Sequence, residues 1–129
     1  NILSTLGSNN LADIKSVNEE NNLYIRILPT VSSVEKAENL GFLPGKIIAV
    51  QGPFSKNLNK VILEDYKIKA LITKESGETG GEAEKIEACF ETGTEVLVLE
   101  RPTISYINCF DDVDVLIQKI FFQQQKNRY

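Results

Sequence analysis

Short β-rich runs alternate with helical segments five times along this chain, and this alternation limits its possible folds more than any other feature. We predict strands over residues 2–5, 23–28, 46–50, 70–73 and 95–100. Several are nearly continuous apolar runs, such as IIAV and VLVL, which are typical of parallel strands buried on both faces. A strand-helix unit repeated in this way predicts an α/β fold with three layers. We therefore expect a doubly wound, five-stranded parallel sheet, Rossmann-like or flavodoxin-like. Hydrophobic patterning does not encode strand order, and we adopt 2-1-3-4-5 as the expectation.

The segments between the strands have helical apolar spacing. Three apolar stripes are predicted to face the core: Leu58, Val61, Ile62 and Tyr66; Ala83, Ile86, Cys89 and Phe90; and Val113, Leu116, Ile117, Ile120 and Phe121. Ser32 with Glu35, and Thr79 with Glu82, have the spacing of capping boxes. Gly93 stands where a helix is expected to end in a left-handed residue.

The composition is that of an ordinary globular protein, with 42% hydrophobic and 25% charged residues. Its length fits a single α/β domain over residues 1–129. The net charge is −4 and the basic residues are scattered, so we expect no nucleic-acid partner. No apolar run suits a membrane span and no signal peptide is recognisable, so we expect no membrane partner and a cytoplasmic location. Because the chain begins at Asn1 and contains no methionine, we expect it to be a piece of a longer protein.

The chain contains no histidine, which excludes several kinds of catalytic site. Ser-His-Asp triads, Cys-His dyads and the usual zinc sites all depend on an imidazole. Cys89 falls on the apolar face of a predicted helix, and we interpret it as a buried thiol. Asp111, Asp112 and Asp114 precede or open the last predicted helix, where negative charge is favourable, so we interpret them as caps. We therefore expect no metal site.

Ligands of doubly wound sheets bind outside the carboxyl ends of the strands. Four loops rich in small residues, glycine or proline follow the first four predicted strands: LGSNN at residues 6–10, PT at 29–30, QGPFS at 51–55 and KESGETGG at 74–81. The turns at the opposite edge of the sheet are less distinctive in composition. We therefore expect a binding site where these four loops meet.

The loop over residues 74–81 has the composition of an anion site. It contains three glycines, two hydroxyl side chains and Lys74, and it precedes a predicted helix start. Glycines allow the backbone to approach a ligand, and a helix start carries positive charge. Neither a GxGxxG nor a P-loop pattern is present. These residues alone are therefore as consistent with a tight turn, in which Thr79 only caps the helix, as with an anion site.

Two other positions have more than one interpretation. Phe54 is either a core residue or an exposed flat surface for a ring-shaped ligand. Arg26 lies between Ile25 and Ile27 in a predicted strand, where a charge is costly without a partner. It either extends to solvent along its aliphatic stem or finds a partner near the sheet edge. Ser55 is placed to cap the helix that follows.

Three motifs in these loops closely resemble the C-terminal half of precorrin-6A reductases. They are RILPT at residues 26–30, AVQGPFS at 49–55 with Asn59 following, and TKESGETGG at 73–81 with Glu84 and Lys85 following. Their order and spacing agree with that family over residues 3–102. Leu6 departs from the pattern, because a smaller hydroxyl residue is expected there. The glycine-rich nucleotide turn of the family belongs to its N-terminal domain, and the chain contains no such turn.

The resemblance implies one half of a two-domain reductase of cobalamin synthesis. Such an enzyme transfers a hydride from NADPH or NADH to precorrin-6A, or to its cobalt form, and this tetrapyrrole substrate carries many carboxylates. The N-terminal domain of the same enzyme is the implied partner, and the isolated chain is expected to be inactive. The implied active cleft lies between the two domains. Which nucleotide is preferred, and which group supplies the proton, stay open.

Lys74 is the residue that we expect to affect the rate, either by binding an anionic group or by stabilising negative charge as hydride arrives. The residues expected to bind substrate or cofactor are those of the four loops: Gly7, Ser8, Thr30, Gln51, Gly52, Ser55, Ser76, Gly77, Thr79, Gly80 and Gly81.

The alternative function is a non-catalytic module that binds an anion or a nucleotide. A phosphoacceptor receiver is disfavoured, because Gly7-Ser8 and Gln51-Gly52 stand where acidic residues are needed. A flavodoxin-like electron carrier needs a hydroxyl-rich phosphate loop after the first strand, where only Ser8 fits. Self-association of the isolated domain, through the surface meant for its partner, is a further possibility.

Overall fold

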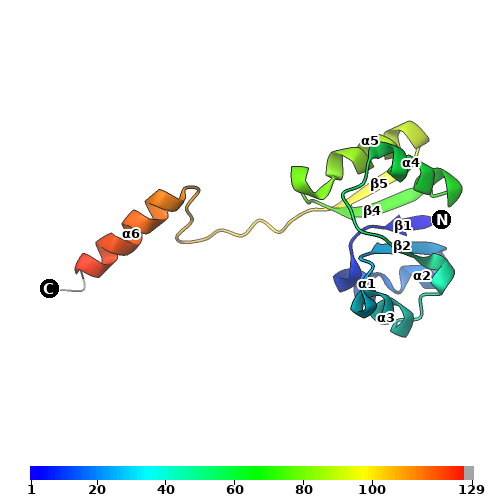
Figure 1. Ribbon diagram of the computed structural model, residues 1–129, viewed down its shortest axis with the longest axis horizontal. Coiled ribbons are helices and arrows are strands. Elements are labelled where there is room, and N and C mark those ends of the chain that lie inside the picture. Colours follow the sequence, from blue (N-terminus) through cyan, green and yellow to red (C-terminus); the bar gives the residue numbers. More distant parts are fainter. Residues whose placement is uncertain (127–129) are drawn as a thin grey trace.

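The computed structural model describes residues 1–126, and residues 127–129 lie outside the described part. Five strands form one sheet: β1 (Ile2–Ser4), β2 (Leu23–Ile27), β3 (Ile47–Ala49), β4 (Ala70–Lys74) and β5 (Glu95–Leu99). All neighbouring strands pair in parallel (Figure 1). Each strand lies within a residue or two of its predicted bounds, and the predicted five-stranded parallel α/β fold is confirmed.

The strand order is β3-β2-β1-β4-β5, so the expected order 2-1-3-4-5 is wrong. β3 pairs with the outer edge of β2, and the chain then crosses the sheet to place β4 beside β1. Burial agrees with this order: Leu3 of β1 and Leu71 of β4 are each 1% exposed, whereas no residue of β3 is buried. The winding direction therefore reverses between β1 and β4, where ligands of such sheets bind.

Helices cover both faces of the sheet, as a three-layer fold requires. On one side lie α1 (Leu11–Ile14), α2 (Val17–Glu20) and α3 (Val31–Asn39), and on the other lie α4 (Lys56–Asp65) and α5 (Glu82–Thr92) (Figure 1). Two apolar clusters join these layers to the sheet. The first contains Leu11, Leu23, Ile25, Ile27, Ala37 and Phe42. The second contains Leu3, Ile62, Leu63, Ile68, Leu71, Ala88 and Cys89, and Cys89 is buried as predicted.

The two edge strands are more exposed than their sequences suggest. IIAV and VLVL were expected to be buried on both faces, but β3 contains no buried residue and Leu97, Val98 and Leu99 are 47%, 44% and 55% exposed. That expectation is wrong because both strands lie at edges of the sheet. Val96 packs against the cluster under α4 and α5, while its neighbours in β5 stay accessible.

The helices α3 and α4 begin at hydroxyl caps. Thr30 Oγ1 accepts a hydrogen bond from the Ser33 N–H at 3.2 Å, so Thr30, rather than Ser32, caps α3 and the predicted box with Glu35 is wrong. Ser55 Oγ accepts from the Leu58 N–H at 3.1 Å and caps α4 as predicted.

The helix α5 begins in a different way from the predicted capping box of Thr79 with Glu82. Gly81, with φ 64°, precedes the helix, and Thr79 lies in the 3-10 turn Glu78–Gly80. The Glu82 carboxylate instead accepts hydrogen bonds from the Ser76 and Gly77 N–H groups, each at 3.0 Å. These bonds hold the loop after β4 against the helix start and lower the pKa of Glu82. The helix ends at Gly93, which is left-handed as predicted.

The last helix, α6 (Val113–Lys126), forms where it was predicted but none of its residues is buried. It projects away from the sheet at the end of an extended segment (Figure 1). Asp112 Oδ1 accepts hydrogen bonds from the Asp114 N–H at 2.7 Å and the Val115 N–H at 3.3 Å, which confirms Asp112 as a cap, and Asp114 lies in the first turn of the helix. Among the described helices, none is both long and apolar enough to cross a membrane.

The apolar stripes predicted for α4 and α5 are misplaced around the helix axis. In α4 the buried residues are Asn59, Ile62 and Leu63, while Leu58, Val61 and Tyr66 of the predicted stripe are exposed. In α5 the buried residues are Lys85, Ala88 and Cys89, while Phe90 is 81% exposed. Each helix thus turns one polar side chain toward the sheet, and both of these side chains belong to the site described next.

Candidate functional site

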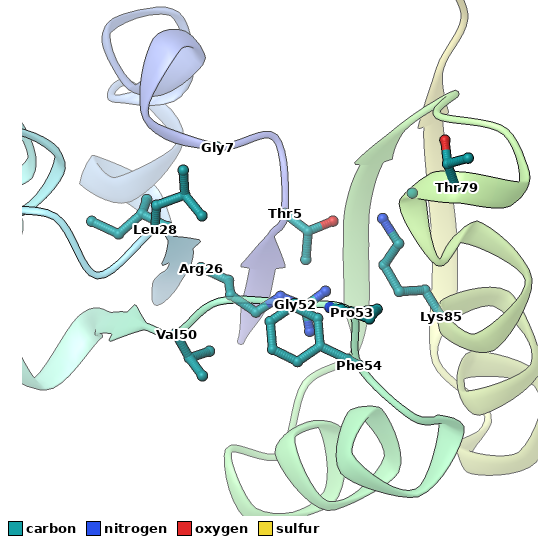
Figure 2. A pocket seen from close by; sticks show the side chains of 12 residues that line it. Thr5, Gly7, Arg26, Leu28, Val50, Gly52, Pro53, Phe54, Thr79 and Lys85 are labelled. Atoms are coloured by element: carbon teal, nitrogen blue, oxygen red, sulfur yellow. The ribbon is translucent and has the colours of Figure 1, made fainter.

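A pocket of about 400 Å³ opens at the carboxyl edge of the sheet, beside the reversal between β1 and β4 (Figure 2). Its lining residues lie at the end of β2, follow β1, β2, β3 and β4, or reach the pocket from α5: Thr5, Gly7, Arg26, Ile27, Leu28, Val50, Gly52, Pro53, Phe54, Thr79, Gly80 and Lys85. Segments far apart in the sequence therefore share one concave surface at the edge where doubly wound sheets bind ligands.

Arg26 forms one side of this pocket. It is 7% exposed, and its Nη1 donates a hydrogen bond to Asn59 Oδ1 at 2.8 Å. Asn59 is itself 2% exposed and is oriented by the bond from its Nδ2 to the Ser55 carbonyl oxygen at 2.9 Å. The guanidinium carbon lies 4.1 Å from the centre of the Phe54 ring, a cation-π contact visible in Figure 2. Burial lowers the pKa of Arg26 to about 10.

Lys85 brings a second buried cation to the pocket from α5. The residue is 6% exposed, and its Nζ donates a hydrogen bond to Thr73 Oγ1 of β4 at 2.9 Å. Burial lowers the pKa of Lys85, and repulsion from Arg26 lowers it further. Attraction to Glu82 acts in the opposite direction, but that carboxylate is already bonded to the Ser76 and Gly77 N–H groups.

Among the described side chains, the hydrogen-bond partners of these two cations are neutral oxygens, so the pocket carries positive charge. The ion pairs found within residues 1–126 join Lys56 and Lys60 to Glu87 and Glu91, and they do not involve Arg26 or Lys85. A buried cation bonded only to neutral oxygens keeps most of its desolvation cost. An anion that enters the pocket offsets this cost, so the arrangement is suited to binding negatively charged groups.

Comparison with known proteins agrees with this geometry. The family model described as precorrin-6x reductase CbiJ/CobK matches residues 1–120. The chain belongs to this family. It is 43% identical over 104 residues to a cobalt-precorrin-6A reductase of Methanothermobacter thermautotrophicus, covering 81% of this chain and 34% of that protein. It is 42% identical over 115 residues to the cobalt-precorrin-6A reductase of Methanocaldococcus jannaschii, covering 88% of this chain and 45% of that protein.

A solved precorrin-6A reductase, CobK, has the same fold. The two chains superpose with a TM-score of 0.66 at 18% sequence identity, over 92% of this chain and 46% of the other. The chain thus spans less than half the length of the precorrin-6A reductases that are compared here.

Four of the expected binding residues of this precorrin-6x reductase family chain line the pocket: Gly7, Gly52, Thr79 and Gly80. Thr30 and Ser55 cap α3 and α4 just outside it. The others do not line it. Ser8 accepts a weak hydrogen bond from Ser33 Oγ at 3.4 Å, Gln51 is exposed, and Ser76, Gly77 and Gly81 form the loop before α5.

Lys74, the expected catalytic residue, is exposed at the end of β4 and does not line the pocket. Its charge is nevertheless close enough to contribute to lowering the pKa of Lys85. It is the last residue of β4, directly before the loop that precedes α5, so a role in binding a large anionic ligand remains a proposal.

Sequence reasoning did not include Thr5, Arg26 and Lys85 among the binding residues and gave Phe54 only as an alternative to a core residue, although the structure brings all four to the pocket. Two signals were available. Arg26 interrupts an apolar strand, and Lys85 lies three and four positions before Ala88 and Cys89, which places it on the same helix face as these two buried residues. A cation on a buried face, at the ligand edge of a sheet, is a candidate binding group.

Proposed function

We propose that this chain is the C-terminal half of an NAD(P)H-dependent precorrin-6A reductase that acts in cobalamin biosynthesis in the cytoplasm. The N-terminal half of the same enzyme is its proposed partner. Membership of the precorrin-6x reductase family supports this proposal, as do the names of the relatives and the fraction of their length that the chain spans. The single observation that carries it is a cation-lined pocket at the sheet reversal of a chain from this family.

The residues of the pocket fit part of an anionic ligand rather than the whole of one. A pocket of about 400 Å³ is at the lower end of the range for drug-sized ligands, so a tetrapyrrole or a dinucleotide inserts only one portion. We assign the main nucleotide-binding role to the N-terminal half in this proposal, because residues 1–129 contain no glycine-rich pyrophosphate turn. When bound, the nicotinamide supplies the hydride that an electron-poor carbon of the macrocycle accepts.

The contribution of this chain is binding and orientation. Arg26 and Lys85 attract anionic groups of the ligand and fix their position, while the Phe54 ring covers one face of the guanidinium. Gly7 lines the pocket without a side chain and leaves room for a bulky ligand, while the absence of a side chain at Gly52 lets the Phe54 ring lie close to it. We retain Lys74, Ser76, Gly77 and Gly81 as proposed rim residues for the remaining anionic groups of the substrate.

Joined to its N-terminal half, the chain should oxidise NADPH or NADH in the presence of precorrin-6A or its cobalt form. Loss of nucleotide absorbance and formation of the dihydro product measure this reaction, and comparing the two nucleotides gives the preference. The Lys74→Ala variant should raise KM, lower kcat, or both, because a cation near the ligand is lost. Unchanged kinetics in that variant would exclude the role of Lys74, and no reduction of either substrate by the joined enzyme would exclude the function.

A second function, an anion- or nucleotide-binding module without catalysis, is favoured by one observation. The buried cations of the pocket suit the binding of an anion, and this binding requires no chemical step. Anion binding by the joined protein with no nucleotide oxidation would favour this module over the reductase.

A further inference from the structure

We infer that Arg26 and Lys85 together form an oxyanion-binding subsite, which holds one carboxylate of the substrate or one phosphate of the cofactor. The identity of this ligand rests on the proposed function, but its charge and its place in the fold do not. The subsite is built by two elements that are distant in sequence, β2 and α5, and it lies in the pocket beside the sheet reversal.

The first argument is burial without neutralisation. Both residues are more than nine-tenths buried, yet their side chains donate to the neutral oxygens of Asn59 and Thr73. Lysine and arginine are almost never fully buried unless they are paired. Lys56 and Lys60 follow this rule, because they lie near the surface and each is paired with Glu91 at 2.8 Å. Among the side chains that the structure describes, neither Arg26 nor Lys85 forms an ion pair, so both are available to an anion.

The second argument is the supply of hydrogen-bond donors. A guanidinium has five N–H groups and an ammonium has three. Within the described residues, one N–H of the Arg26 guanidinium is bonded to Asn59, and one N–H of the Lys85 ammonium is bonded to Thr73. The remaining donors come from two side chains that line the same pocket. Carboxylates and phosphates accept several such bonds at once, and the planar guanidinium matches their geometry.

The third argument is that the site is held in place before any ligand arrives. Asn59 is fixed by the Ser55 carbonyl oxygen, and Ser55 in turn caps α4. The Phe54 ring lies against the guanidinium of Arg26, and Figure 2 shows Lys85 extending from α5 toward β4. A group that is oriented in advance loses little conformational freedom on binding, which increases affinity.

The experiment measures binding of two probes to the 129-residue chain by calorimetry at constant ionic strength. One probe is uroporphyrin, a tetrapyrrole with many carboxylates and no phosphate, and the other is inorganic pyrophosphate. Lys85→Met removes the buried charge while keeping an unbranched chain, and it should weaken binding of the preferred probe by about tenfold or more. Lys69→Met is the matched control, because Lys69 is exposed next to the opposite end of β4, and it should bind as the unchanged protein does.

A second variant keeps both cations and guards against misfolding of the first. Asn59→Asp places a carboxylate where Asn59 Oδ1 now lies 2.8 Å from Arg26 Nη1, so it should neutralise the guanidinium and weaken binding of the same probe, at the loss of the bond that Nδ2 donates to the Ser55 carbonyl oxygen. Circular dichroism confirms that each variant is folded. If Lys85→Met and Asn59→Asp both bind as tightly as the unchanged chain, or if Lys69→Met loses as much affinity as they do, the subsite is disproved.

The two probes separate the two sources of the anion. Preference for uroporphyrin assigns the subsite to a substrate carboxylate, and preference for pyrophosphate assigns it to a cofactor phosphate. Binding of neither probe disproves the subsite, even if the joined enzyme reduces precorrin-6A. Charge-dependent binding without reduction by the joined enzyme supports the subsite and disproves the proposed function instead.

Discussion

Arg26 and Lys85 show how a protein keeps positive charge in its interior when the bonded partners are neutral oxygens. Each is bonded to one neutral oxygen, and burial lowers the pKa of both side chains. The Arg26 guanidinium also gains from the π electrons of Phe54. These contacts make the two charges tolerable, but they do not remove the cost of desolvation. At the scale of single residues, the two buried cations therefore lower the stability of the fold.

The lowered pKa of Lys85 predicts a dependence of stability on pH. The folded chain binds this proton less tightly than the unfolded chain, whose lysine pKa is near 10.5. Stability from this group therefore increases as pH rises from the lowered folded value toward 10.5, and it is absent at lower pH. Urea unfolding between pH 7 and pH 10.5 measures the effect. Lys85→Met should lack this increase, and an identical pH dependence in both proteins would contradict the desolvation of Lys85.

Gly80 is restricted by a neighbour rather than by its own backbone angles. A side-chain carbon added there would collide with Cβ and Oγ of Ser76. We expect Gly80→Ala to lower the free energy of unfolding by about 1–3 kcal/mol, as overpacking does elsewhere. Gly45→Ala is the control, because a carbon at Gly45 meets open space, and it should change stability by less than about 1 kcal/mol. Equal stability of the two variants in urea would mean that Ser76 moves aside freely.

At the scale of elements, α4 and α5 form one layer whose inner faces carry the residues of the site. Asn59 and Lys85 occupy positions on these faces that apolar residues would usually fill. On the outer surface of the same layer, ion pairs join the two helices, because the Glu91 carboxylate of α5 accepts from Lys56 and Lys60 of α4. These contacts lower the pKa of Glu91 to about 2 and raise that of Lys56.

The lowered pKa of Glu91 predicts an acid-sensitive contribution to stability. A carboxyl whose pKa falls on folding stabilises the protein above its unfolded value of 4.5, and this contribution is lost as pH falls toward 2. The melting temperature of Glu91→Gln should therefore fall by less between pH 6 and pH 3 than that of the unchanged chain. Salt at about 1 M should reduce the difference, because the groups are at the surface. Glu87→Gln is the control, since Glu87 meets Lys56 only at 3.8 Å.

At the scale of the whole molecule, strand order decides where the site lies. Because β4 returns to the side of β1, the loops after these two strands flank a single pocket, which Lys85 of α5 and Arg26 of β2 both line. The expected order 2-1-3-4-5 would have inserted β3 between β1 and β4 and moved these groups apart. The remainder of the described chain, α6 and the segment before it, makes no buried contribution to this domain.

Ending the chain at Pro102 should therefore leave the sheet folded. Arg101, which donates to the Glu75 carbonyl oxygen at 3.0 Å, is retained. We expect the melting temperature to change by less than about 4 °C. A stability change of about 1 kcal/mol would shift the melting temperature of a domain of this size by more than that. The shortened chain should also associate less in light scattering, because α6 exposes Phe121 and Phe122. Unfolding of the shortened chain would show that α6 stabilises the sheet.

The amino-acid sequence by itself determined the class of this fold and the kind of loop at its binding edge. Strand propensity, apolar runs and the signals at Ser55 and Gly93 are local, so they can be read without knowing what packs against them. The RILPT, QGPFS and TKESGETGG motifs are likewise contiguous, and they indicated the family that the comparisons then established.

Only the tertiary structure decided the strand order, the buried faces of α4 and α5, and the composition of the pocket. Each depends on which distant segments meet. Leu58 and Phe90 are apolar but exposed, whereas Asn59 and Lys85 are polar but buried, because the sheet and the Arg26 side chain lie on their side of the helices. Burial is a property of the neighbours that folding brings together, and hydrophobic periodicity alone does not report those neighbours.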